Sequence, residues 1–178
     1  ISKKIKEKFN INDDIERVSN GINSIKNEIL SSNKLKDKKV NISYIEGFEE
    51  FCKNAKDNNI KVAIATNAPM KFINTVDKIL NLKKVFGKNI FSCEHVNNVK
   101  KPDPKLFIYT MNQLNLKPQN CCIFEDSESG ILAANKSGAG YIVRMETQKT
   151  SHNSKVANVT IKDFFEAKIE SIIKAISN

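Results

Sequence analysis

The spacing of apolar residues changes near residue 44, and this change divides the chain into two parts. Residues 1–40 carry apolar side chains three or four positions apart, the spacing that places them on one face of an amphipathic helix. No strand-like run occurs there. Beyond residue 44, short apolar runs alternate with segments of helical spacing. Helices alone followed by alternation predict a separate helical piece joined to an α/β core.

The second part contains short apolar runs that predict strands. A run without polar alternation is typical of a strand buried on both faces of a parallel sheet. The expected strands are 61–66, 89–92, 121–124, 140–145 and 157–161. The expected helices are 48–58, 67–80, 104–114, 131–136 and 164–176, with a turn at 125–130 and a polar loop at 147–155. This order predicts βαβ units in a doubly wound parallel sheet.

The formal net charge of +9 is the unusual feature of the composition. A positive field favours anionic partners such as phosphate esters. It does not indicate nucleic-acid binding, because the lysines are scattered and the only arginines are Arg17 and Arg144. Solvated faces of a lysine- and asparagine-rich protein explain the charge more simply.

The residue pattern gives little support for a membrane protein or a zinc-binding protein. No apolar stretch approaches the roughly 20 residues that cross a bilayer, and no signal peptide is visible. The histidines His95 and His152 have no partner at zinc-ligand spacing. Without C-x-x-C spacing, the cysteines are interpreted as reduced and buried in a cytoplasmic protein. They are Cys52, Cys93, Cys121 and Cys122.

Polar side chains occur at three sites, each at the end of a predicted strand or the start of a predicted helix. Ligands of open parallel sheets bind at the carboxyl ends of the strands, so these side chains form the candidate site. A hydroxyl followed by a helix start offers an anion cradle. A lysine whose backbone is stiffened by two prolines that follow it can neutralise phosphate charge, and paired carboxylates suit Mg²⁺. In chain order the three sites are Thr66-Asn67, Lys100-Lys101 and Glu125-Asp126.

Each site has a simpler structural explanation when it is taken alone. Thr66 or Asn67 would merely cap the next helix. The lysine pair would be solvated at the start of a helix. Asp126 or Ser127 would cap the helix that follows the acidic turn. The position of all three sites at strand ends or helix starts favours a shared function.

Together the three segments resemble the haloacid dehalogenase (HAD) superfamily of phosphohydrolases. The resemblance is to the helical-cap class, which includes β-phosphoglucomutase-like and phosphoglycolate-phosphatase-like enzymes, and it covers about residues 45–159. The matching segments are IATNAP, KKPDPKLF and IFEDSESGILAANKSGAGYI. The resemblance implies a Rossmann-like core over residues 44–178, lacking its first strand, and the remnant of a helical cap domain over residues 1–43.

The resemblance also implies Mg²⁺-dependent phosphoryl transfer from a small phosphorylated substrate. Thr66 would hydrogen-bond the phosphoryl oxygens, with support from the backbone of Asn67. Lys101 would neutralise the charge of nucleophile and phosphate. Asp126 would bind Mg²⁺, with Glu125 as a direct or water-mediated partner.

The first motif of the family, Asp-x-Asp followed by Gly, does not occur in these 178 residues. In the family its first aspartate becomes a transient phospho-aspartate and its second acts as acid and base. We therefore expect the nucleophile to lie outside this chain, and a start at Ile1 favours an upstream segment. The alternative is a truncated or non-catalytic HAD-like protein that binds phosphate or a partner. The sequence does not identify the phosphate ester, the oligomeric state, or whether the reaction is that of a phosphatase or a mutase.

Overall fold

The computed structural model describes residues 42–146 and 155–176. These residues belong to the unit formed by residues 42–178. The predicted cap remnant over residues 1–43 and the predicted polar loop over residues 147–155 therefore lie almost entirely outside the described part.

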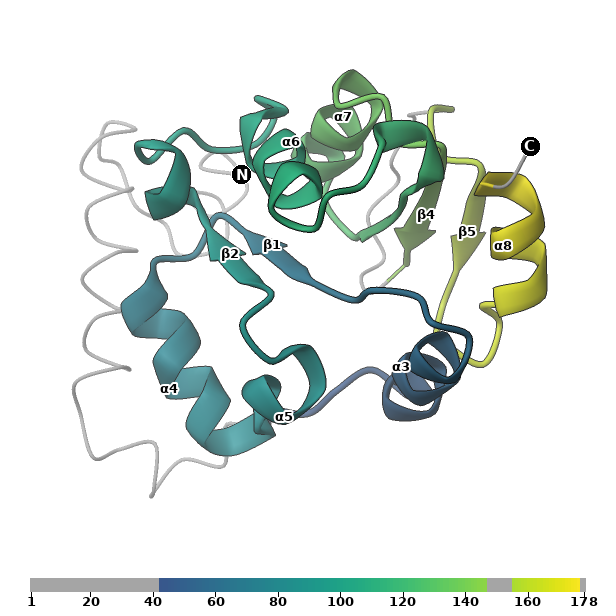
Figure 1. Cartoon of the computed structure of the whole chain (residues 1–178), viewed down its shortest axis with the longest axis horizontal. Coiled ribbons are helices and arrows are strands. Elements are labelled where there is room, and N and C mark those ends of the chain that lie inside the picture. Colours follow the sequence, from purple (N-terminus) through teal and green to yellow (C-terminus); the bar gives the residue numbers. More distant parts are fainter. Residues whose placement is uncertain (1–41, 147–154, 177–178) are drawn as a thin grey trace, which may run out of the picture. The chain divides into compact units, whose positions relative to one another are not determined.

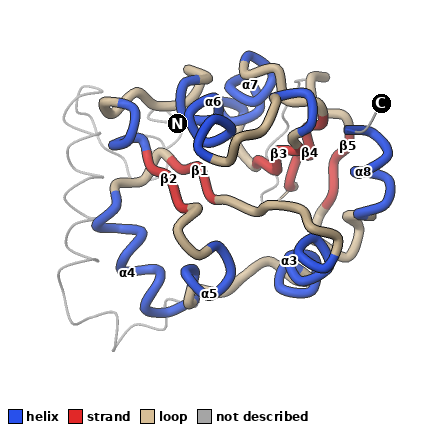
Figure 2. The backbone as a smooth tube through the Cα atoms, in the orientation of Figure 1, coloured by secondary structure: helices blue, strands red, loops and turns tan. Residues whose placement is uncertain are grey.

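The strands of the described part form two parallel sheets (Figures 1 and 2). They are β1 (Ile64–Thr66), β2 (Ile90–Ser92), β3 (Cys122–Glu125), β4 (Tyr141–Met145) and β5 (Val159–Ile161). One sheet has the order β1-β2 and the other β3-β4-β5, and every ladder is parallel. Thr66 lies opposite Ser92, and Glu125 lies opposite Arg144. The predicted α/β class with parallel strands is confirmed.

Helices lie between consecutive strands from β1 to β4, because parallel strands need a crossover connection. The helices of the described part are α3 (Phe48–Asp57), α4 (Met70–Leu80), α5 (Leu82–Phe86), α6 (Lys105–Gln113), α7 (Glu128–Lys136) and α8 (Ile169–Ile176), with 3₁₀ turns η2 (Cys93–Val96) and η3 (Pro118–Asn120). The sequence did not predict α5 or either 3₁₀ turn. Within the described ranges, no helix is long and apolar enough to cross a membrane.

Several predicted elements are shorter than expected, and two of them have a local reason. Of the strand predicted over 61–66, only β1 is formed, because the side chain of Asn89 donates to the Val62 carbonyl at 3.2 Å, outside any strand ladder. The helix predicted from residue 164 begins only at α8. The Asp163 carboxylate accepts from the backbone N–H groups of Phe165 and Glu166, which holds this segment in a turn.

Apolar side chains pack on both faces of the strands, with neighbouring residues of a strand on opposite faces. α6 and α7 pack on one face, where Ile123 and Ile142 join a cluster with Phe107, Met111 and Ile131. On the other face of β1 and β2, the cluster consists of Ile73, Leu82, Phe86 and Ile90, with Val62 and Ile64 against it. A third cluster of Val143, Met145 and Ile161 includes Phe124 and Phe164 at its edge.

β1 and β3 do not pair with each other. Figure 2 shows the strands in the order β2, β1, β3, β4, β5, and the ladder is interrupted between β1 and β3. All of β1 is only partly buried, whereas all of β2 is buried. Within the described residues, β1 and β3 therefore each keep one edge that belongs to no ladder.

The cysteines carry no disulfide; Cys52 and Cys93 are buried, whereas Cys121 and Cys122 are only partly buried. The prediction of burial is thus wrong for the last two, which pack at the edges of core clusters and keep part of their surface exposed. Burial raises the pKa of Cys52 to about 11 and that of Cys122 to about 12.

We predict that Cys52 and Cys122 resist alkylation while the protein is folded. At pH 8, a thiol with a raised pKa of about 11 is about one part in a thousand thiolate, the reactive form. Mass spectrometry after iodoacetamide treatment, with and without urea, measures this. Equal labelling of these two thiols in both conditions would contradict the prediction.

We also predict that Ile131→Ala lowers the free energy of unfolding by about 3 kcal/mol, because it leaves a cavity between α7 and the sheet. Ile131 is 0% exposed and belongs to the first cluster. Leu132→Ala, at the next position and 36% exposed, is the control and should cost less than about 1 kcal/mol. Urea unfolding measures both, and equal losses would show that the packing of α7 is misassigned.

Candidate active site

Thr66 ends β1, and Asn67 begins the turn that leads to α4. The Thr66 hydroxyl oxygen accepts a hydrogen bond from the backbone N–H of Ala68 at 3.1 Å. α4 has Pro69 at its N-cap position and no side-chain cap. The capping explanation is therefore wrong for both Thr66 and Asn67. The hydroxyl keeps its own proton for a further acceptor.

Lys101 is fixed at the end of β1 by both its backbone and its ammonium group. Its backbone N–H donates to Oδ1 of Asn67 at 3.0 Å, and its Nζ donates to the Ala65 carbonyl at 2.9 Å. The Nζ also donates to the carboxylate of Glu125. Because the Lys101 side chain is only 7% exposed, the explanation as a solvated pair holds for the exposed Lys100 alone.

The Lys101–Glu125 ion pair joins the carboxyl ends of β1 and β3. The Glu125 side chain is 10% exposed, so both charges are largely removed from water. The Nζ of Lys101 also lies 4.4 Å from the centroid of the Phe107 ring, where the ring face attracts a cation. Breaking such a pair by removing one partner costs about 3–5 kcal/mol, because the other charge stays buried without compensation.

In the acidic turn after β3, the neighbouring residues 125–127 have different contacts. The Ser127 hydroxyl donates to Oε2 of Glu125 at 3.2 Å and accepts from the backbone N–H of Gly130 at 3.1 Å. Ser127 is thus the N-cap of α7, as one explanation from sequence proposed. Asp126, between these two residues, is exposed.

Gly130 makes room for the Glu125 carboxylate. A Cβ atom at this position would overlap the carboxyl carbon and oxygens of Glu125. The carboxylate therefore lies directly against the first turn of α7. Since Lys101 and Ser127 both hold the carboxylate, it cannot move aside without losing these bonds.

The acidic pair provides hard oxygen donors for a divalent cation. Within residues 42–146 and 155–176, no group of three or more His, Cys, Asp or Glu side chains is placed to hold a metal ion. Mg²⁺ commonly takes only one or two carboxylates and completes its shell with water and substrate phosphate. The donor set of Asp126 and Glu125 therefore fits Mg²⁺, and their assignment as ligands stays a prediction.

The structure thus brings together most of the predicted residues. Lys101 contacts Asn67 and Glu125, and Thr66 lies between Ala65 and Asn67, which both contact Lys101. Sequence reasoning did not find the Ala65 carbonyl or Phe107. A carbonyl leaves no trace in the residue type, and Phe107 resembles any core residue of a helix.

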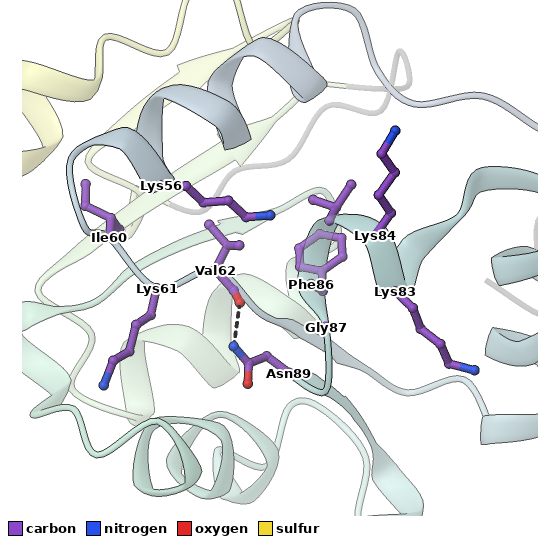
Figure 3. Close-up of a pocket in the computed structure, with 10 residues that line it drawn as sticks. Lys56, Ile60, Lys61, Val62, Lys83, Lys84, Phe86, Gly87 and Asn89 are labelled. Carbon is purple, nitrogen blue, oxygen red and sulfur yellow. Dashed lines mark hydrogen bonds between the residues drawn. The ribbon is translucent and has the colours of Figure 1, made fainter.

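The cavity in Figure 3 lies away from these residues. It has a volume of about 350 Å³ and is found at the amino ends of β1 and β2, where the Asn89 side chain contacts the Val62 carbonyl. Its lysines are Lys56, Lys61, Lys83 and Lys84. None of the predicted site residues lines it, so it is not the site formed at the carboxyl ends.

Comparison with known proteins identifies the family of the chain. The family model of the haloacid dehalogenase-like hydrolases matches residues 20–138, more than half of the chain. The chain belongs to the HAD-like hydrolases. The match includes the Thr66, Lys101 and Glu125 segments in one alignment.

Individual relatives of this HAD-like chain are distant. The phosphorylated carbohydrates phosphatase of Thermotoga maritima is 34% identical over 92 residues, which are 52% of this chain and 42% of that protein. The chain thus spans less than half the length of that relative. A HAD hydrolase of family IA, variant 3, from Entamoeba histolytica has a TM-score of 0.79 at 22% identity. The superposition covers 99% of this chain and 78% of that chain.

A putative β-phosphoglucomutase from Thermotoga maritima has a TM-score of 0.58 at 23% identity, with 97% of this chain and 74% of that chain covered. At these identities the two structures show the fold. They confirm the predicted Rossmann-like fold.

We predict that Gly130→Ala destabilises this HAD-like core by about 1–3 kcal/mol, because the new methyl group displaces the Glu125 carboxylate. An alanine in a helix normally stabilises by about 1 kcal/mol relative to glycine, so the expected sign is the reverse of the usual one. Urea unfolding measures the effect.

The control places the same substitution in a Lys101→Met/Glu125→Ala background, where no carboxylate occupies the space. There, Gly130→Ala should become stabilising. A stabilising effect of Gly130→Ala in the unmodified protein would show that the carboxylate does not lie against α7.

Proposed function

We propose that the chain is the core of a Mg²⁺-dependent phosphohydrolase that acts on a small phosphomonoester through an aspartyl-phosphate, with the nucleophilic aspartate outside these 178 residues. The observation that carries the proposal is the position of Lys101. Its ammonium is held between the Ala65 carbonyl and the Glu125 carboxylate, at the carboxyl ends of β1 and β3. Ala65 directly precedes Thr66 in β1. A fixed cation at the end of the strand that carries a hydroxyl is suited to an anionic group.

The chain's own residues would act by position and charge. The Thr66 hydroxyl and the backbone N–H of Asn67 would donate to oxygens of the phosphoryl group. Lys101 would offset the negative charge that gathers when an anionic nucleophile approaches phosphate. Phosphoryl transfer depends mainly on such positioning and electrostatic stabilisation, which supports these roles.

Asp126 and Glu125 are the proposed Mg²⁺ ligands. The bound ion would shield the negative charge of the phosphate from the nucleophile. The exposed Asp126 side chain is accessible to a hydrated ion. Glu125 already accepts from Lys101 and Ser127, so its contribution would pass through water or through a shift of its carboxylate.

The interruption between β1 and β3 supports a nucleophile on an additional strand. A parallel strand inserted there would form ladders with both neighbours. Its carboxyl end would lie beside Lys101, because Lys101 contacts the carboxyl ends of both β1 and β3. An aspartate at that end would face the lysine and the Thr66 hydroxyl. Residues 1–43 would then belong to a cap domain.

The substrate class proposed is a small phosphate ester in the cytoplasm. The name of the Thermotoga maritima relative, a phosphorylated carbohydrates phosphatase, supports this class. The net charge of +9 favours an anionic substrate in addition. Both a phosphatase and a phosphomutase fit these features.

A second candidate function is a non-catalytic HAD-like protein that binds phosphate or a partner. The observation that favours it is the absence of an Asp-x-Asp-Gly segment from the 178 residues. Such a protein would bind inorganic phosphate but release none from an ester.

We predict that the natural polypeptide hydrolyses p-nitrophenyl phosphate with Mg²⁺ and loses the activity with EDTA. Lys101→Met and Asp126→Asn should each lower kcat/KM at least about 100-fold, since each removes a charge that stabilises the transition state. Lys100→Met, at the exposed neighbouring position, is the matched control and should keep the activity within about threefold.

Because Lys101→Met leaves Glu125 without its partner, its folding is checked by circular dichroism. Asp126→Asn changes an exposed side chain and keeps the test valid if Lys101→Met does not fold. Full activity of Asp126→Asn would remove the proposed metal site. Phosphate binding without hydrolysis by the natural polypeptide would establish the second candidate function.

A further inference from the structure

Residues 93–101, which follow β2, hold residues 66–70, here called the Thr66 loop, by hydrogen bonds at three points. The Cys93 thiol donates to the Asn67 carbonyl at 3.2 Å, and the Lys101 backbone N–H donates to the Asn67 side chain at 3.0 Å. The Glu94 carboxylate accepts from the backbone N–H of Met70 at 3.2 Å, at the first residue of α4.

Asn67 is the residue that this segment contacts twice. One of its oxygens, Oδ1, binds the backbone beside the proposed catalytic lysine, and the other, its carbonyl oxygen, binds a cysteine that is 2% exposed. Cys93 directly follows the buried β2, whose last residue, Ser92, is in register with Thr66. The turn around Cys93 is therefore anchored to the packed sheet, and through it Asn67 is anchored too.

The two hydrogen bonds of Asn67 determine the position of the Lys101 backbone. A lysine side chain has four carbons of freedom between its backbone and its ammonium group. At the far end, the Lys101 ammonium is tied to the Ala65 carbonyl, two residues before Asn67. At the near end, only the Asn67 side chain ties the backbone of Lys101 to the Thr66 loop among the hydrogen bonds of the described residues. The lysine is thus fixed at both ends to the same three-residue stretch.

We propose that Asn67, held by Cys93, is a positioning residue that sets the distance between the Thr66 hydroxyl and the Lys101 ammonium. The inference rests on the proposed function and adds to it a role for the Asn67 side chain and for Cys93. Without the Asn67 side-chain oxygen, Lys101 keeps its charge, but its backbone loses the hydrogen bond that holds it to the Thr66 loop. Displacements of about 1 Å near reacting groups can cost about 100-fold in rate.

The test compares four variants of the natural polypeptide in p-nitrophenyl phosphate hydrolysis. Asn67→Ala should lower kcat about 10- to 100-fold and change KM less than about threefold, because the charge that attracts the substrate remains. Asn67→Asp keeps an acceptor oxygen and should recover most of kcat, with a raised KM since the added charge repels the substrate. Cys93→Ser keeps a donor and should have a higher kcat than Cys93→Ala.

Asn112→Ala, on the exposed side of α6, is the matched control and should leave kcat unchanged. A purely structural role for Asn67 would lower the melting temperature and leave kcat of the folded protein unchanged. Equal kcat values for wild type and Asn67→Ala, measured well below the melting temperature, would overturn the proposal.

Amide hydrogen exchange separates this inference from the proposed function. In Asn67→Ala, the backbone N–H of Lys101 loses its acceptor and should exchange at least tenfold faster, whether or not the protein is an enzyme. If wild type hydrolyses no ester, the proposed function fails, and exchange alone decides the Asn67 contact. Unchanged exchange at Lys101 in Asn67→Ala would overturn it.

Discussion

The ion pair of Lys101 and Glu125 connects the two sheets of this HAD-like core. Its partners lie 24 positions apart in the sequence and are both nearly buried. Charges removed from water in this way are stable only when each has its partner and its remaining hydrogen bonds. The Ala65 carbonyl supplies one such bond to Lys101, and Ser127 supplies one to Glu125. The geometry of the site therefore depends on keeping β1 and β3 at a fixed spacing.

That spacing is set by apolar packing rather than by the charges. Phe107 on α6 packs in the cluster that includes Ile123 of β3 and Ala65 of β1, and its ring also contacts the Lys101 ammonium. One side chain thus joins the core to the polar site. The Glu125 carboxylate is placed in a similar way, because Ser127 both caps α7 and donates to it. The start of α7 and the position of this carboxylate are consequently coupled.

The sequence was most informative where a local pattern determines the structure. The alternation of apolar runs and helical segments predicted each strand and most helices, and the polar residues at strand ends predicted where the site would form. It failed where a side chain far along the chain intervenes. Asn89 takes the Val62 carbonyl where a longer strand was predicted, and Glu125 pairs with Lys101, a contact that the sequence did not predict. Such pairings need the tertiary fold, because nothing in the residues around Val62 or Lys101 indicates a distant partner.

The edges of β1 and β3 that pair with no strand of the described residues have a consequence for handling the protein. A strand edge with free N–H and C=O groups accepts any extended peptide of suitable register, including one from another copy of the same chain. In the described residues, these edges belong to strands that carry partly buried apolar side chains, among them Ile64 and Phe124. Samples consisting of these 178 residues alone are therefore expected to self-associate through strand addition. Dimers or fibres seen in such samples would report on the exposed edges rather than on a native assembly.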